Sequence, residues 1–140
     1  MLTEEEQGAG MKKEERMKKL MIIDDDTSFL EEVSEALKED GYDVITVSES
    51  TQALKIAIEK KPDIILLDLN MEGMSGFQLA DELRNNKNTM DIPIIGVTGF
   101  YTEREHGLFM RVCGIRECLI KPVDPKLMTA AIEKVLKKKR

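Results

Sequence analysis

The stretch KKLMIIDDDTSF, residues 18–29, joins an apolar run to a cluster of acids. The apolar residues end at Ile23, and Asp24, Asp25 and Asp26 follow directly. Placing like charges side by side costs free energy unless a cation or solvent compensates them. The pattern therefore predicts a buried strand that ends in a charged turn, with a functional or a capping task for the acids.

The same alternation of a short apolar run and an amphipathic stretch occurs five times along the chain. The runs that predict strands are KKLMII (18–23), YDVITV (42–47), DIILL (63–67), IPIIGV (92–97) and IRECLI (115–120). The third and fourth runs are the most solidly apolar, which favours central positions in a sheet. Such alternation is typical of a parallel sheet covered by helices on both faces.

A helix is predicted after each run. Ser28 with Glu31 forms a capping-box pattern that opens the first helix, and Ser50 starts the second. The apolar spacing from Phe77 to Leu83 predicts the third helix. Residues 102–112 carry a weaker fourth helical pattern, and Asp124–Pro125 opens the fifth helix. The predicted fold class is α/β, a doubly wound (βα)5 parallel sheet.

Composition points to one acidic domain. The chain has 140 residues with 41% hydrophobic content, which suits a single core, and its net charge of -6 argues against general nucleic-acid binding. Residues 1–17 are polar without a hydrophobic period, so we expect a flexible N-terminal extension before a domain over 18–140. Without a transmembrane-length segment or a signal-peptide core, the sequence predicts a cytoplasmic location and no membrane partner.

Polar side chains follow four of the five runs. Because right-handed crossovers bring the carboxyl ends of parallel strands to one edge, where ligands bind, these side chains are expected to share a site. They are Asp24, Asp25 and Asp26 after the first run, Asp68 after the third, Thr98 after the fourth and Lys121, followed by Pro122, after the fifth. Each has an ordinary structural explanation, such as helix capping for the three acids. Four such strand ends on one rim favour a functional site.

The chemistry of this set fits phosphoryl transfer. Clustered carboxylates favour a hard cation such as Mg2+, which keeps waters free for a phosphate. A remaining carboxylate can act as a nucleophile on a phosphoryl group. Lys121 and Thr98 would then stabilise the phosphoryl oxygens.

The motifs IIDDD, LLDLNMEGMSG, GVTG and LIKPVD, in this order and spacing, resemble those of response-regulator receiver domains. The likeness covers about residues 18–138, and over this range the chain resembles the single-domain chemotaxis regulators. It implies a flavodoxin-like sheet with strand order 2-1-3-4-5. It also implies that Asp24 and Asp25 bind Mg2+ together with Asp68 and the backbone carbonyl of Asn70, and that Asp68 is the phosphoacceptor.

The resemblance further implies that Lys121 contacts the phosphoryl group and forms a cis peptide bond with Pro122. In the family, the threonine equivalent to Thr98 is coupled to an aromatic residue three positions before the lysine. That position holds Cys118 here, so the aromatic residue of the usual threonine–aromatic switch is replaced. Glu72 stands where the family often has proline.

The implied function is a phosphorylation-controlled switch of a two-component phosphorelay. The partners would be a histidine kinase or phosphotransfer protein and an unidentified target protein, with the chain acting as a monomer or a phosphorylation-dependent homodimer. The chain would assist only its own aspartyl phosphorylation and dephosphorylation, and would not be an enzyme toward another substrate. Because no DNA-binding or catalytic domain follows the fifth predicted helix, we expect a stand-alone receiver.

Two alternatives remain open on the sequence. A phosphorylation-independent adaptor with the same fold is suggested by Cys118 and Glu72. The order Asp24, Asp26 and Ser28 also resembles the haloacid-dehalogenase phosphatase signature, although that class needs a later pair of metal carboxylates where the chain supplies Asp124 alone. A calcium loop starting at Asp68 is excluded, because its twelfth position, which requires glutamate, is Leu79.

Overall fold

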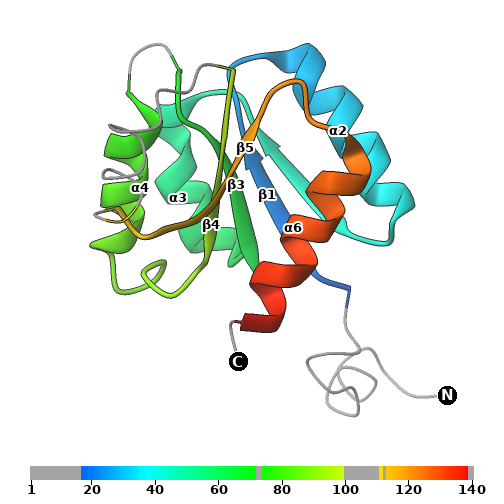
Figure 1. The fold of residues 1–140 in the computed structure, drawn as a ribbon. Helices are drawn as coiled ribbons and strands as arrows, with labels where there is room; N and C mark the ends of the chain where they lie inside the picture. The colour runs from blue at the N-terminus through cyan, green and yellow to red at the C-terminus, as the bar shows by residue number, and fades with distance from the viewer. Residues whose placement is uncertain (1–16, 72–73, 100–110, 112, 139–140) are drawn as a thin grey trace, which may run out of the picture.

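The computed structural model describes residues 17–71, 74–99, 111 and 113–138 (Figure 1). Within them, five parallel strands form one sheet in the order β2-β1-β3-β4-β5. The strands are β1 (Lys19–Ile23), β2 (Asp43–Val47), β3 (Ile64–Asp68), β4 (Ile94–Thr98) and β5 (Ile115–Ile120). The predicted fold class and strand order are confirmed. Every residue of β3 and β4 is buried, as their apolar runs predicted.

Four described helices cover the sheet, two on each face (Figure 1). The helices α2 (Thr27–Glu39) and α6 (Pro125–Lys138) lie on one face, and α3 (Ser50–Lys60) and α4 (Gly76–Arg84) lie on the other. The side chains of β1 alternate between the two cores: Leu20 and Ile22 pack toward α2 and α6, whereas Met21 and Ile23 pack toward α3 and α4. The predicted helix at 102–112 falls almost entirely outside the described residues.

The predicted helix start at Ser28 is wrong. The N-cap of α2 is Asp26, whose Oδ1 accepts the N–H of Phe29 at 3.2 Å, and the helix begins at Thr27. Aspartate and serine are both good N-caps, so residue type alone does not select between Asp26 and Ser28. A capping box does form on α4, where Ser75 and Gln78 bond each other's backbone N–H.

An extra residue in β5 sets the position of the chain at the carboxyl edge of the sheet. Ile94 pairs with Ile115, but Ile95 pairs with Glu117, which leaves one residue of β5 without a partner in the register. After this shift Thr98 lies beside Ile120, and the N–H of Lys121 donates to the carbonyl of Thr98 at 2.8 Å. The shift therefore determines that Lys121 leaves the sheet next to the end of β4.

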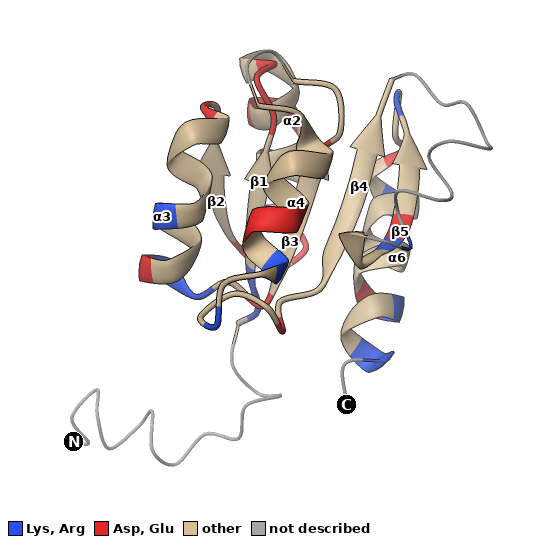
Figure 2. Cartoon of the chain, turned by 90° about the vertical axis from the view of Figure 1, so that its left-hand side faces the viewer, with Lys and Arg blue, Asp and Glu red and all other residues tan. Residues whose placement is uncertain are grey.

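The charged residues lie mainly on the helices and at the strand ends (Figure 2). The basic last turn of α6 contains Lys137 and Lys138, where cations complement the helix dipole. Among the described helices, none is both long enough and apolar enough to cross a membrane.

Candidate functional site

Three carboxylates meet at the carboxyl edge of the sheet. Asp24 directly follows β1 and Asp68 ends β3, and these two strands are neighbours. One carboxylate oxygen each of Asp24, Asp25 and Asp68 lies within 4.8 Å of the others. Asp24 and Asp68 are 1% and 4% exposed, whereas Asp25 is exposed. Burial of two acids so close together is costly without a cation, which makes this cluster the candidate site.

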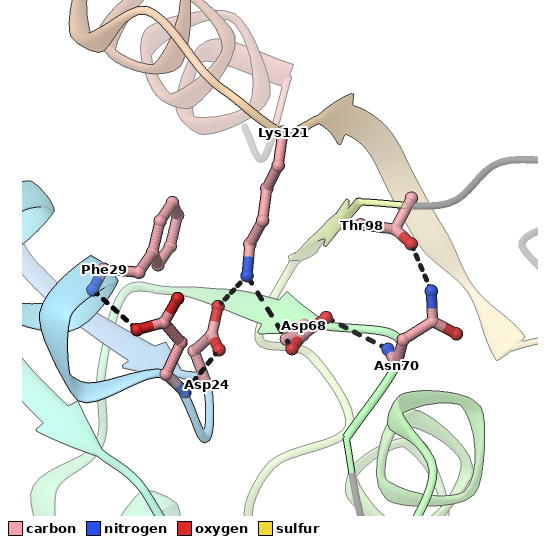
Figure 3. Close-up of polar contacts among 7 residues, drawn as sticks. Asp24, Phe29, Asp68, Asn70, Thr98 and Lys121 are labelled. Carbon is pink, nitrogen blue, oxygen red and sulfur yellow. Dashed lines mark hydrogen bonds and ion pairs between the residues drawn. The ribbon is translucent and has the colours of Figure 1, made fainter.

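Lys121, which follows β5, points its positively charged ammonium toward Asp24 and Asp68 (Figure 3). Its Nζ lies 2.6 Å from Asp24 Oδ2 and 3.9 Å from Asp68 Oδ2. The Lys121–Pro122 peptide bond is cis, which is the geometry that the resemblance implied. The lysine is thus closest to the metal-ligand candidate Asp24, and not to the phosphoacceptor candidate Asp68.

Backbone N–H groups orient both buried carboxylates. Asp24 Oδ1 accepts the N–H of Asp26 at 2.9 Å, and Asp68 Oδ1 accepts the N–H of Asn70 at 3.0 Å. Both bonds join a carboxylate to the residue two positions later, so the turns after β1 and β3 fix the acids that precede them. The orientation of these carboxylates is therefore built into the backbone.

Burial, and to a lesser extent the nearby carboxylate of Asp24, raise the pKa of Asp68 to about 6, against the opposing effects of the Asn70 N–H and the Lys121 ammonium. The positive charge that the protein itself provides therefore does not offset the cost of ionising Asp68. A divalent cation bound by these oxygens would provide the missing charge, so the carboxylate donors fit Mg2+.

Thr98 and Asn70 form a second part of the site (Figure 3). Thr98 ends β4 and is fully buried, and its Oγ1 accepts a hydrogen bond from the Asn70 side-chain amide at 2.7 Å. This bond connects the end of β4 to the loop that follows β3. The hydroxyl therefore already has a polar partner in the absence of a phosphoryl group.

Cys118 occupies the position that the family usually gives to an aromatic residue. It lies opposite Gly96 in the sheet and is half-buried. Burial, and secondarily the carboxylate of Glu117, raises the pKa of its thiol, which disfavours the reactive thiolate. The geometry thus favours a packing role for Cys118. Glu72, the other departure from the family pattern, lies outside the described residues.

The structure also brings in contacts that the sequence analysis did not anticipate. The Phe29 ring lies under Lys121, with Nζ 4.3 Å from the ring centroid. The Asn70 side-chain amide donates to Thr98 Oγ1, whereas the resemblance implied a role only for the Asn70 backbone carbonyl. Neither contact has a sequence signal, because both depend on the approach of segments far apart in the chain.

Comparisons with known proteins agree with this architecture. Residues 20–133 match the model of the response regulator receiver domain family. Protein PilH of Pseudomonas aeruginosa is 32% identical over 100 residues, which cover 71% of this chain and 82% of PilH. The phosphate regulon transcriptional regulatory protein PhoB of the same organism is 32% identical over 108 residues, which cover 77% of this chain and 47% of PhoB. The chain thus spans less than half the length of PhoB.

Solved structures give the same result. The CheY-like receiver domain protein of Methanospirillum hungatei JF-1 has a TM-score of 0.81 and 26% identity, with coverage of 89% of this chain and 97% of that chain. Chemotaxis protein CheY4 of Vibrio cholerae has a TM-score of 0.81 and 29% identity, with coverage of 86% and 99%. These likenesses leave no support for the haloacid-dehalogenase alternative. The chain belongs to the response regulator receiver domain family of two-component signalling.

Proposed function

We propose that this chain is a phosphorylation-controlled switch of a two-component phosphorelay, with Asp68 as the phosphoacceptor. The observation that carries the proposal is the position of Asp68. It ends a fully buried strand and is one of three acids whose carboxylate oxygens lie within 4.8 Å of one another. The Nζ of Lys121 lies 3.9 Å from its Oδ2. A buried carboxylate beside a cation and other acids is suited to nucleophilic attack on a phosphoryl group once its charge is compensated.

The acids that would hold Mg2+ are Asp24, Asp25 and Asp68, with the backbone carbonyl of Asn70 as a further oxygen donor. All are hard oxygen ligands, which Mg2+ prefers. The raised pKa of Asp68, about 6, means that added positive charge would favour the ionised, nucleophilic form near neutral pH. Bound Mg2+ would supply charge that stabilises the phosphoryl oxygens during transfer.

The chain's own residues would act as follows. A carboxylate oxygen of Asp68 attacks the phosphorus of a partner's phosphohistidine, so that a P–O bond forms as the P–N bond breaks and the imidazole leaves. Lys121 pairs with a phosphoryl oxygen, and the Thr98 O–H donates to another, which its Oγ1 can do while still accepting from the Asn70 amide. Hydrolysis reverses the switch, because water attacks the phosphorus and Asp68 is released as the carboxylate.

The partners implied are a histidine kinase or phosphotransfer protein as phosphodonor and a target protein that binds the phosphorylated form. We place the chain in the cytoplasm, as a monomer or a phosphorylation-dependent homodimer, with residues 18–140 as the receiver domain and 1–17 as an extension. Apart from assisting its own phosphorylation and dephosphorylation, it would catalyse no reaction. Its output would be a change in protein binding.

The test is incubation with acetyl phosphate or phosphoramidate, with and without Mg2+, followed by intact mass spectrometry. We expect one phosphate adduct that requires Mg2+ and is absent from Asp68→Asn. Asp43→Asn is the matched control, because it makes the same change at an exposed position at the start of β2. It should be labelled like the wild type.

Each outcome separates this proposal from the adaptor alternative. Labelling of Asp68→Asn would show that another residue is the acceptor. If a phosphohistidine-carrying partner also failed to label the folded wild type, the chain would act as a phosphorylation-independent adaptor.

A further inference from the structure

We propose that Phe29 is a positioning residue that holds Lys121 on Asp24 in the unphosphorylated protein and thereby weakens Mg2+ binding. This inference rests on the proposed function, because it concerns the same acids. It assigns a task to a ring that is otherwise only part of the hydrophobic packing. The Phe29 ring is held in place, the Lys121 ammonium lies over it, and the ammonium occupies the metal-ligand candidate Asp24.

The ring is fixed from two directions. Phe29 lies in the first turn of α2, and its N–H donates to the N-cap Asp26, whose own N–H donates to Asp24. The half-buried side chain packs against the hydrophobic cluster between the sheet and the helices α2 and α6. Helix cap and core packing together therefore leave the ring at the rim of the acid cluster.

The ammonium of Lys121 has three attractive neighbours (Figure 3). Nζ lies 2.6 Å from Asp24 Oδ2, 3.9 Å from Asp68 Oδ2 and 4.3 Å from the Phe29 ring centroid. A lysine ammonium within about 6 Å of an aromatic face is attracted by the electron density of the ring. The ring and Asp24 thus favour the same position of the ammonium, which lies beyond hydrogen-bond distance from Asp68.

This position uses Asp24 on both of its oxygens. Oδ1 accepts the N–H of Asp26, and Oδ2 accepts the Lys121 ammonium. A divalent cation bound to Asp24 would compete with that ammonium for Oδ2 and would be repelled by its charge. Ion binding therefore requires Lys121 to move away, and any interaction that stabilises the resting position lowers the affinity for Mg2+.

The first measurement detects the contact itself, without Mg2+ or phosphate. A methylene group near an aromatic face shows a ring-current shift, so we expect an upfield position for the Lys121 ε-CH2 protons in NMR spectra of lysine-labelled wild type. Lys121→Arg identifies the signal by its disappearance. The shift should persist in Phe29→Tyr, which keeps a ring, and should be lost in Phe29→Leu.

The second measurement detects the consequence. We expect Phe29→Leu to bind Mg2+ about two- to fivefold more tightly than the wild type in an NMR titration, the range that corresponds to an exposed cation–π contact. Phe29→Tyr should keep the wild-type affinity. Phe77→Leu is the matched control, because Phe77 is also a half-buried ring but packs on the opposite face of the sheet. Its affinity should be unchanged.

The outcomes distinguish this inference from the proposed function. Equal Mg2+ affinity of Phe29→Leu and wild type, or a Lys121 signal without an upfield shift, would overturn the role of Phe29 and leave the metal site standing. An equal gain in affinity in Phe77→Leu would also overturn it, because the effect would come from general loosening. Absence of Mg2+ binding by every variant and the wild type would overturn both the metal site and this inference.

Discussion

The carboxyl edge of the sheet has two contrasting halves. The acid half, at the ends of β1 and β3, holds Asp24 and Asp68 at 1% and 4% exposure, and a side chain carbon added to Gly76 would lie 2.3 Å from the Asp68 carbonyl oxygen. The open half, at the ends of β4 and β5, includes Ile120 at 53% exposure, and no described atom lies within 4 Å of a carbon added to Gly99.

This difference shows that charge is concentrated where the packing is tightest. A side chain added at Gly76 meets fixed backbone, whereas Gly99 and Ile120 face open space, although Thr98 at the end of β4 is fully buried. Lys121 joins the halves, because it leaves β5 but pairs with Asp24 across the site. We therefore expect mutational costs to be unequal along one edge of the same sheet.

The largest expected difference in stability is between two glycines. In Gly76→Ala the new methyl group would collide with the backbone of Asp68 and Leu69, at 2.3 Å and 2.5 Å, so α4 or the end of β3 must shift. We expect a loss of about 3 kcal/mol in the free energy of unfolding, measured by urea denaturation. Gly99→Ala should change it by less than about 0.5 kcal/mol. Equal losses in both variants would contradict the contrast between the halves.

The sequence predicted the tightly packed half best. Strand runs as apolar as 63–67 cannot be mistaken for surface segments, and the carboxyl ends of parallel strands must share an edge, so the grouping of Asp24, Asp68 and Lys121 followed from topology. The close approach at Gly76 was missed, because it depends on how α4 packs onto the end of β3. No periodicity reports such a distance.

The register of β5 and the N-cap of α2 could not be predicted from the sequence either. The extra residue in β5 changes the register after Ile94, and an apolar run such as IRECLI carries no mark of it. The N-cap of α2 is ambiguous in the sequence, because Asp26, Thr27 and Ser28 are all competent N-caps. The sequence thus predicted which elements lie side by side, and the structure shows which of their atoms are in contact.

The second prediction concerns charge in the acid half. Because the pKa of Asp68 is raised to about 6 in the folded protein, the folded state holds this proton more tightly than the unfolded chain does. The stabilising contribution of protonated Asp68 is therefore fully present below about pH 4 and is lost as the pH rises through about 6. Above that range, an ionised Asp68 opposes folding.

Asp68→Asn removes this titration. Without Mg2+, we expect the variant to exceed the wild type by roughly 2 to 3 kcal/mol in free energy of unfolding at about pH 8, and by much less at about pH 4. Denaturation of both proteins across this range measures the difference, and Mg2+ should reduce it at high pH. A difference independent of pH would show that packing, and not charge, explains the effect.

The smallest expected effect separates the task of Asp26 from that of Asp24. Asp26 caps α2 through Oδ1, whereas Asp24 faces Lys121, so Asp26→Ala should cost about 1 kcal/mol of unfolding free energy without removing a carboxylate from the cluster. Asp26→Asn should retain most of the stability, because asparagine caps equally well, and Ser28→Ala should change little, because Ser28 lies inside the helix. Thermal unfolding of the three variants measures these differences. A larger loss in Ser28→Ala than in Asp26→Ala would restore the capping box at Ser28; a loss in Asp26→Asn as large as in Asp26→Ala would mean that the charge of Asp26, and not its cap, stabilises the start of α2.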